Sequence, residues 1–152
     1  MPVKILMVCL GNICRSPLAE GILQSKISKT ICIVDSAGTA NYHVGEAPDK
    51  RSIATAKKNG IDISNQKCRQ IKRSDFETFD YIYVMDKNNY KNVIAIAPNK
   101  EAELKVQLIL NELHPSMDLE VPDPYYGGID GFEEVFKMLD DACNMIVQKI
   151  NK

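Results

Sequence analysis

The chain has 152 residues, of which 45% are hydrophobic and 26% are charged, and we expect a single globular domain over residues 1–152. Nineteen basic residues against twenty acidic ones give a formal net charge of −1. This balance excludes a general electrostatic attraction to nucleic acid or to an anionic membrane surface, so any anion must be bound locally.

The cysteine spacing and the hydropathy indicate in which cellular compartment the protein works and whether it binds a metal. The five cysteines are an odd number, and no two of them form a Cys-x-x-Cys pair, so neither a disulfide framework nor a zinc site is indicated. No apolar run approaches the roughly 18 residues of a membrane span. We expect a cytoplasmic protein with no metal, no other cofactor, and no nucleic-acid or membrane partner.

The first predicted elements are a strand, a sharp loop and a helix. Lys4–Val8 is a short apolar run suited to a strand that is buried on both faces. The residues that follow are Cys9, Leu10, Gly11, Asn12, Ile13, Cys14, Arg15 and Ser16. Ser16 and Pro17 favour a helix N-terminus, with Ser16 as the cap. Gly11 and Asn12 tolerate the unusual backbone angles that the loop requires.

This unit predicts a loop that binds an anion next to a thiol. The loop N–H groups and the positive end of the helix point at one place, which suits a phosphate. Cys9 stands at the rim, where these dipoles and a guanidinium favour its thiolate form near neutral pH. Arg15 offers a planar fork for two phosphoryl oxygens. The pattern Cys-x5-Arg-Ser therefore indicates a phosphoryl-accepting nucleophile, with the phosphate bound by the residues from Leu10 to Ser16.

The next elements alternate between helix and strand. The predicted core positions of the first helix are Leu18, Ile22, Leu23 and Ile27. A second buried strand is predicted at Ile31–Val34, and Asp49 can cap a helix that runs to Lys58. Tyr81–Met85 is a third apolar, β-prone run, after which Asp86 can cap a further helix.

The loops between these elements contain fewer residues that indicate a function. Tyr42 is a large aromatic on a polar loop, where it can wall a pocket or simply cover the surface. His43 is expected on the surface, because nothing nearby in sequence could share a metal with it. A basic run is interpreted as a solvated face, with guidance of acidic substrates as the alternative; it consists of Lys67, Arg69, Lys72 and Arg73.

The C-terminal elements complete the predicted fold. Leu104–Leu113 alternates like a strand but also allows a helical turn, and its type stays open. Asp130 and Glu133 resemble a capping box at the start of a last helix. The core stripe of that helix comprises Phe132, Val135, Phe136, Leu139, Cys143, Ile146 and Ile150. This alternation predicts one three-layer α/β domain with a short parallel sheet and its ligand at the carboxyl ends of the strands.

A second informative loop holds Asp123 between Pro122 and Pro124, which restrict its backbone. A thiolate nucleophile needs an acid to protonate the departing oxygen, and a carboxyl on a rigid loop is suitable. Tyr125 and Tyr126 follow directly and can flank a flat substrate ring. We therefore predict Asp123 as the general acid, with the two tyrosines in the substrate wall.

The run Val8-Cys9-Leu10-Gly11-Asn12-Ile13-Cys14-Arg15-Ser16-Pro17 resembles the signature of the low-molecular-weight protein tyrosine phosphatases. Other blocks resemble that family in the same order, so the resemblance covers nearly the whole chain; they are Ser36-Ala37-Gly38-Thr39, Phe79-Asp80-Tyr81, Met85-Asp86 and Asp123-Pro124-Tyr125-Tyr126. The resemblance implies a four-stranded parallel sheet flanked by helices, with the phosphate-binding loop after the first strand. It also implies that Ser36 helps orient Asn12, against the alternative of a solvated turn serine, and that Tyr42 lies in the substrate wall.

The predicted reaction is the hydrolysis of phosphotyrosine in a protein substrate, for which a tyrosine kinase is a candidate. Cys9 attacks the phosphorus, while Arg15 and the loop N–H groups hold the equatorial oxygens. Asp123 protonates the leaving oxygen and then activates the water that hydrolyses the cysteinyl-phosphate. Arg15 and the loop dipoles take the place of a cation, so no metal is required. We expect a monomer or weak self-association.

Three alternatives use a similar loop. Arsenate reductases of this fold need two further cysteines on a mobile segment, but Cys68 and Cys143 are far apart in the sequence. Protein-arginine phosphatases carry a threonine where Ile13 stands, and an apolar Ile13 in the substrate wall fits an aryl phosphate better. A non-catalytic phosphotyrosine-binding module would need neither Cys9 nor Asp123.

Cys14 has two interpretations. It lies five residues from Cys9 around a tight loop, so a protective Cys9–Cys14 disulfide under peroxide is plausible. Equally, it can be a second cysteine packed beneath the loop.

Overall fold

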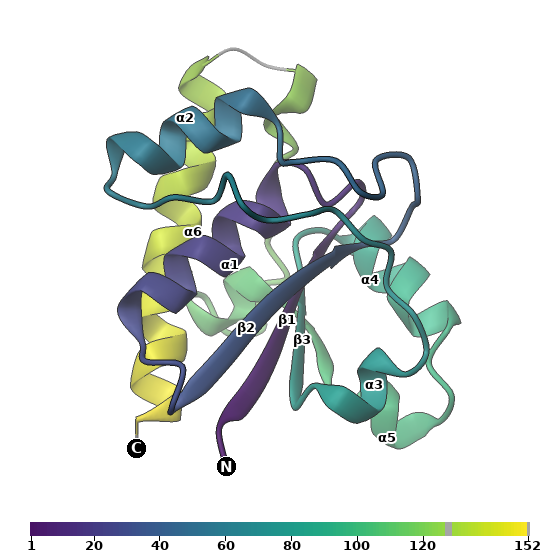
Figure 1. Ribbon diagram of the computed structural model, residues 1–152. Coiled ribbons are helices and arrows are strands. Elements are labelled where there is room, and N and C mark those ends of the chain that lie inside the picture. The colour runs from purple at the N-terminus through teal and green to yellow at the C-terminus, as the bar shows by residue number, and fades with distance from the viewer. Residues whose placement is uncertain (127–128, 152) are drawn as a thin grey trace.

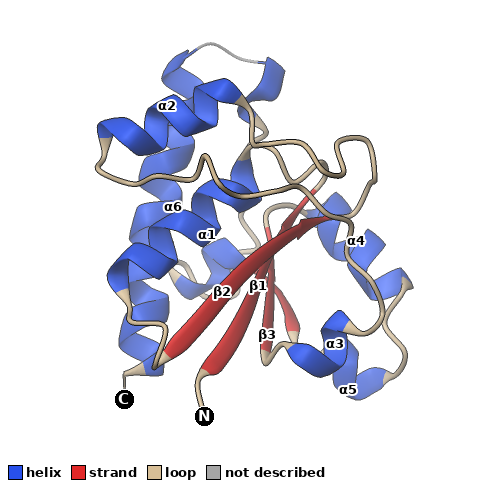
Figure 2. Ribbon diagram, in the orientation of Figure 1, coloured by secondary structure: helices blue, strands red, loops and turns tan. Residues whose placement is uncertain are grey.

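The computed structural model describes residues 1–126 and 129–151 (Figure 1). Its elements are β1 (Val3–Cys9), α1 (Arg15–Lys26), β2 (Cys32–Gly38), α2 (Lys50–Lys58), α3 (Asp75–Thr78), β3 (Tyr81–Val84), α4 (Lys87–Ala95), α5 (Lys100–Glu103), β4 (Val106–Leu108), η1 (Ile109–Glu112), η2 (Pro124–Tyr126) and α6 (Ile129–Ile150). The strands form one parallel sheet in the order β2-β1-β3-β4 (Figure 2). This confirms the predicted α/β class and its four-stranded parallel sheet.

Helices cover both faces of the sheet. Figure 1 shows α1 and α6 on one face and α3, α4 and α5 on the other. Strand β1 is buried on both sides: Ile5 and Met7 join the core under α1 and α6, whereas Leu6 and Val8 join the core on the opposite face. This alternation follows from the two-residue period of a strand. The prediction of a strand with two covered faces at Lys4–Val8 is therefore confirmed.

Strand β2 differs from the prediction. It runs from Cys32 to Gly38, so it begins and ends later than the predicted run Ile31–Val34. It is also an edge strand, and Ile31 and Ile33 are 45% and 37% exposed. Cys32 and Val34 join the core under α1 and α6, but Ile33 joins neither core cluster of the described residues. The prediction of a buried strand was wrong at Ile31 and Ile33, because this end of the edge strand is covered on one face only, whereas Ala37 further along is fully buried.

Helix capping agrees with the sequence at two of four places. Asp49 caps α2 by accepting a hydrogen bond from the Arg51 N–H at 2.8 Å, and Asp86 caps α4 in a capping box with Asn89. By contrast, α6 begins at Ile129, so Asp130 lies in its first turn and does not precede it.

The prediction that Ser16 caps α1 was wrong, as was the predicted cap at Asp130. The helix begins at Arg15, which places the predicted cap residue Ser16 inside the first turn. Cys14 takes the cap position, and within the described residues no side chain caps this N-terminus. The Ser16 hydroxyl is instead engaged with Cys9 and Asn12.

The segment Leu104–Leu113, whose secondary structure the sequence left open, contains both a strand and a short helix. Val106–Leu108 pairs with β3 as β4, and Ile109–Glu112 continues as the short helix η1. None of the helices formed by the described residues is both long and apolar enough to cross a membrane.

Gly38 ends β2 where the strand passes close to the loop between β1 and α1. A Cβ atom on Gly38 would lie 2.7 Å from the carbonyl oxygen of Leu10 and 3.1 Å from the amide nitrogen of Asn12. Because both atoms belong to the backbone, neither could move aside alone. The sheet therefore fixes the position of the loop only if residue 38 lacks a side chain.

We expect Gly38→Ala to lower the free energy of unfolding by about 1–3 kcal/mol, the usual cost of overpacking a tight site. Gly131 in α6 provides a control, since the nearest atom that a Cβ there would meet in the described part of the chain is the Cβ of Pro124 at 3.7 Å. Gly131→Ala should raise the free energy of unfolding by about 0.5–1 kcal/mol through helix propensity. Urea denaturation of both variants measures the difference. Equal stability of the two variants would contradict the close approach at Gly38.

Candidate active site

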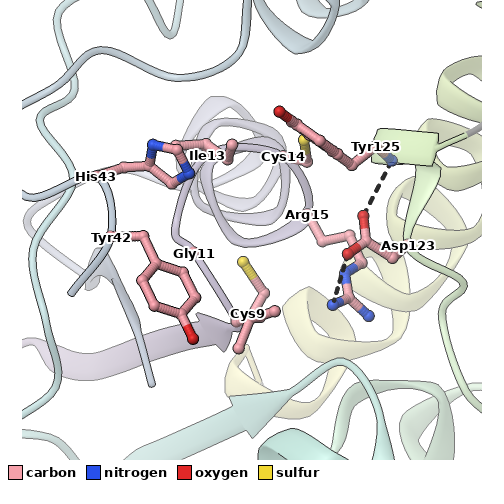
Figure 3. A pocket seen from close by; sticks show the side chains of 10 residues that line it. Cys9, Gly11, Ile13, Cys14, Arg15, Tyr42, His43, Asp123 and Tyr125 are labelled. Atoms are coloured by element: carbon pink, nitrogen blue, oxygen red, sulfur yellow. Dashed lines mark hydrogen bonds and ion pairs between the residues drawn. The ribbon is translucent and has the colours of Figure 1, made fainter. Parts of the chain in front are cut away.

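A pocket of about 170 Å³ opens at the carboxyl end of β1 (Figure 3). It is lined by Cys9, Leu10, Gly11, Ile13, Cys14, Arg15, Tyr42, His43, Asp123 and Tyr125. Among these described residues, His43 alone was not a predicted site residue. Three segments far apart in the sequence thus meet at one place: the loop from β1 to α1, the loop after β2, and the loop that leads into η2. This agrees with the rule that ligands bind at the carboxyl ends of parallel strands.

Cys9 is the last residue of β1 and is 2% exposed. Its sulfur lies 3.0 Å from the hydroxyl oxygen of Ser16. That hydroxyl oxygen also accepts a hydrogen bond from the side-chain amide of Asn12 at 2.8 Å. The Ser16 hydroxyl lies between two acceptors, the Cys9 sulfur at 3.0 Å and the carbonyl oxygen of Ala37 at 3.4 Å. A hydroxyl that donates to sulfur stabilises the thiolate form.

Arg15 is almost completely buried, with 2% of its surface exposed, and three partners contact its guanidinium. Its Nη1 donates to Oδ2 of Asp86 at 2.7 Å and to the carbonyl oxygen of Val121 at 2.9 Å, and its Nη2 lies 3.7 Å from Oδ2 of Asp123. Burial alone would lower the pKa of Arg15, but the negative charges of Cys9, Asp86 and Asp123 outweigh it and raise that pKa. The guanidinium is thus permanently charged and fixed in direction.

Asp86 has a second function that the sequence reasoning missed. It was predicted only as the cap of α4, where its Oδ1 accepts the N–H of Asn89 at 2.8 Å. Its Oδ2 binds Arg15 at the same time. The available signal was topological: Asp86 follows β3, which pairs with β1, so both strand ends reach the same edge of the sheet.

Asn12 organises the loop from within. Its φ of 58° is in the left-handed region, which asparagine tolerates better than most residues. Its side-chain amide donates to the hydroxyls of Ser16 and Ser36 at 2.8 and 3.0 Å, and its Oδ1 accepts the N–H of Arg69 at 3.0 Å. Its carbonyl oxygen accepts a hydrogen bond from the thiol of Cys68 at 2.8 Å. Asn12 and Ser16 are buried and are not among the described residues that line the pocket, so these side chains support the loop.

Ser36 connects this network to a carboxyl group. It is 4% exposed, so the alternative of a solvated turn serine was wrong. Its hydroxyl donates to Oε1 of Glu20 at 2.6 Å. Burial raises the pKa of Glu20 from its ordinary value of 4.5 to about 7, and the charge of Asp35 adds to this, while Ser36 and Arg69 oppose it.

Arg69 is the exception in the basic run, whose other members Lys67, Lys72 and Arg73 are exposed, as a solvated face requires. Its guanidinium pairs with Asp35 at 3.1 Å and with the buried Asp75 at 3.0 Å, so it is not a free solvated charge. Its backbone N–H and carbonyl bind Asn12 and Gly38 respectively. Arg69 therefore fixes the segment that supports the loop between β1 and α1, and its own charge is already paired.

The rim of the pocket has two sides (Figure 3). Tyr42, 71% exposed, and His43 lie on one side, with Asp123 and Tyr125 on the other. The His43 ring packs against Gly11, where a Cβ would come within 3.3 Å of its Cδ2 atom. A side chain at residue 11 would therefore need the His43 ring to shift slightly, and the backbone of Gly11 is not in the left-handed region. His43 was expected on the surface, and only its position next to Tyr42 in sequence could have indicated the pocket.

Asp123 is one-third exposed, and its Oδ1 accepts the backbone N–H of Tyr125 at 3.0 Å. This bond orients the carboxylate, while its Oδ2 faces Arg15. Tyr125 lines the pocket as predicted. The side chain of Tyr126, the other predicted wall residue, lies outside the described part of the structure.

The remaining cysteines are all buried. Cys14 lines the pocket, and burial together with the negative charge of Asp49 raises the pKa of its thiol to about 12. Cys68 contacts the loop between β1 and α1 through the Asn12 carbonyl, whereas Cys143 of α6 lies in the hydrophobic core. The described residues contain no group of three or more His, Cys, Asp or Glu side chains that could hold a metal ion.

Comparisons with known proteins agree on one family. A family model described as low molecular weight phosphotyrosine protein phosphatase matches residues 4–152. The chain is 39% identical to the Schizosaccharomyces pombe protein of that name, covering 97% of each chain. It is similar to the solved structure of a protein tyrosine phosphatase from Entamoeba histolytica with HEPES in the active site, with a TM-score of 0.91, 38% identity and coverage of 98% and 97%. A Drosophila arginine phosphatase has a TM-score of 0.89, 32% identity and coverage of 99% of each chain.

The pKa of Glu20 predicts a dependence of stability on pH. Between pH 4.5 and about 7 the folded protein keeps a proton on Glu20 that the unfolded chain releases. The contribution of Glu20 to stability is therefore complete below pH 4.5 and is lost as the pH rises through about 7. Glu20→Gln removes this dependence, so the variant should gain stability relative to the unmutated protein between pH 5 and pH 8. Urea unfolding at both pH values checks this; a stability difference that does not change with pH would contradict it.

Proposed function

The chain belongs to the low molecular weight phosphotyrosine protein phosphatase family, and we propose that Cys9, Arg15 and Asp123 carry out its hydrolysis of phosphotyrosine. The observation that carries this assignment is the pocket that all three residues line, with Arg15 bound to Asp86 and facing Asp123. A thiol, a fixed cation and a carboxyl group at one site are the parts that a cysteine-based phosphatase needs.

In the first step the Cys9 sulfur attacks the phosphorus, and the S–P bond forms as the bond to the tyrosine oxygen breaks. Asp123 gives its proton to that oxygen. Arg15 and the backbone N–H groups from Leu10 to Arg15 bind the three equatorial oxygens, on which charge is concentrated. Asp86 and Val121 fix the guanidinium before substrate binds, so little reorganisation is needed during the reaction.

In the second step Asp123, now a carboxylate, takes a proton from water as the water oxygen bonds to phosphorus. The S–P bond breaks, and Cys9 leaves as a thiolate that the Ser16 hydroxyl stabilises at 3.0 Å. Inorganic phosphate is released with the enzyme in its starting state. Every proton and bond is accounted for by protein side chains and water, with Arg15 in the role that a metal ion has at many phosphoryl-transfer sites.

Substrate selection follows from the walls of the pocket. Ile13, Tyr42 and Tyr125 offer apolar and aromatic surfaces that suit the flat ring of phosphotyrosine. The physiological substrates in this proposal are cytoplasmic phosphotyrosine proteins, with a tyrosine kinase as a candidate, and the enzyme acts as a monomer or a weakly associated form. The exposed rim residues Tyr42 and Tyr125 support weak self-association.

Hydrolysis of three substrates in EDTA tests the mechanism: a phosphotyrosine peptide, a phosphoserine peptide and phosphoarginine. We expect activity on phosphotyrosine alone. Cys9→Ser should abolish it because the nucleophile is lost, and Asp123→Ala should lower kcat by about two to four orders of magnitude because the acid is lost.

Each alternative gives a different result. Unchanged turnover in Cys9→Ser would reject the mechanism. A preference for phosphoarginine would move the substrate to the arginine phosphatases, to which the Drosophila protein belongs by name. Binding of phosphotyrosine without turnover would indicate the non-catalytic module.

We further propose that Cys14 protects the nucleophile from peroxide. Peroxide oxidises the Cys9 thiolate to a sulfenic acid, and the Cys14 thiolate then attacks that sulfur and releases hydroxide, which leaves a Cys9–Cys14 disulfide. Both residues line the pocket, which supports the pairing. The raised pKa of Cys14, about 12, makes its thiolate scarce at neutral pH, so the disulfide should form faster as the pH rises.

Peroxide treatment followed by a thiol reductant provides the test. The unmutated enzyme should recover activity, whereas Cys14→Ser should recover less, because its Cys9 proceeds to irreversible oxidation. Cys32→Ala in β2, away from the pocket, is the control and should recover like the unmutated enzyme. The protective function is wrong if Cys14→Ser recovers as fully as the control.

A further inference from the structure

Arg51, in the first turn of α2, lies against the residues that follow the general acid. Its guanidinium carbon is 5.2 Å from the centre of the Tyr125 ring and 4.7 Å from the centre of the Phe132 ring. Distances below about 6 Å allow a cation–π interaction. Phe132 is completely buried in α6, so it gives the guanidinium a fixed surface, whereas Tyr125 is 40% exposed and lines the pocket.

Asp49 fixes the orientation of the Arg51 guanidinium. Its two carboxylate oxygens accept hydrogen bonds from Nε and Nη2 of Arg51, each at 3.0 Å. This two-point contact demands the planar fork of an arginine, which a lysine cannot reproduce. The pair lowers the pKa of Asp49, so the carboxylate is charged whenever the enzyme works near neutral pH.

Asp49 is itself attached to the phosphate-binding loop. Its backbone N–H donates to the carbonyl oxygen of Ile13 at 2.8 Å. The contacts therefore run without a gap from Ile13 through Asp49 and Arg51 to Tyr125, whose own N–H binds the carboxylate of Asp123. They link the loop that binds phosphate to the loop that carries the acid and the aromatic wall.

We propose that Arg51 is a positioning residue for substrate selection, which holds the Tyr125 ring at the distance from the phosphate-binding loop that an aryl phosphate requires. The inference rests on the proposed function, because it assigns the Tyr125 ring to the wall that contacts the substrate. Arg51 does not touch the reacting atoms. Its effect reaches the substrate through Tyr125 and concerns the ring of the substrate, not its phosphate.

Steady-state kinetics of Arg51→Met separate binding of the substrate ring from binding of its phosphate. KM for a phosphotyrosine peptide should rise about two- to fivefold, as the loss of an exposed cation–π contact allows. The value of kcat should stay unchanged, because a contact made equally in the ground and transition states affects KM alone. The inhibition constant of inorganic phosphate, which does not reach the ring, should also stay unchanged and shows that the variant is folded.

Further variants isolate the interaction. Arg51→Lys should give a smaller rise in KM, since it keeps the charge but not the fork. Asp49→Asn should raise KM in the same direction while it keeps the helix cap, because asparagine caps as well as aspartate. Lys58→Met is the matched control: Lys58 also joins α2 to α6, through Glu133 at 2.9 Å, but the cation–π contact with the Tyr125 ring comes from Arg51, so the KM of the Lys58 variant should not change.

A double-mutant cycle with Tyr125→Ala decides whether Arg51 acts through Tyr125. In the Tyr125→Ala background, Arg51→Met should cause no further rise in KM. An equal rise in both backgrounds would overturn the inference, as would a parallel rise in the phosphate inhibition constant. An unmutated enzyme without activity on the phosphotyrosine peptide would contradict the proposed function itself, which is a distinct result.

Discussion

The left-handed backbone at Asn12 is the constraint on which the site depends. A loop that turns its N–H groups toward one point cannot use those groups to stabilise itself, so its shape must be held by other bonds. Asn12 provides them: its side chain and carbonyl bind Ser16, Ser36, Arg69 and Cys68, which belong to α1, to β2 and to the loop after α2. The loop is therefore shaped by the fold around it before any anion binds, which is the condition for strong electrostatic stabilisation.

A buried arginine creates a second requirement. An unpaired charge that is almost fully buried would be costly, so the guanidinium of Arg15 must have anionic and carbonyl partners. Asp86 and Val121 supply them from one side, and Cys9 and Asp123 contribute negative charge from the other. The same carboxylate of Asp86 caps α4. The start of this helix and the orientation of the Arg15 guanidinium are thus coupled through one side chain.

The walls of the pocket are held in place by other interactions than its floor. The floor is buried and fixed by short hydrogen bonds, whereas the rim residues Tyr42 and Tyr125 are exposed and held by packing contacts such as those of His43 and Arg51. In the proposed mechanism, phosphate binding and ring selection can therefore vary independently. Substitutions at the rim can change which substrates are accepted while the geometry around Cys9 and Arg15 stays the same.

The sequence by itself determined the order of the elements, the parallel α/β class and the residues from Cys9 to Arg15, because apolar periods, caps and a dense local motif depend on neighbours in the chain. Resemblance added the number of strands and the position of Tyr42. Only the tertiary structure decided which distant residues complete the site. Asp86, His43 and Arg69 carried local signals of a cap, a surface residue and a solvated charge, and each gained its function from a partner brought close by folding. The Ser16 cap failed for the same reason, because in the folded chain its hydroxyl is bound by Asn12 and Cys9 and cannot serve the helix end.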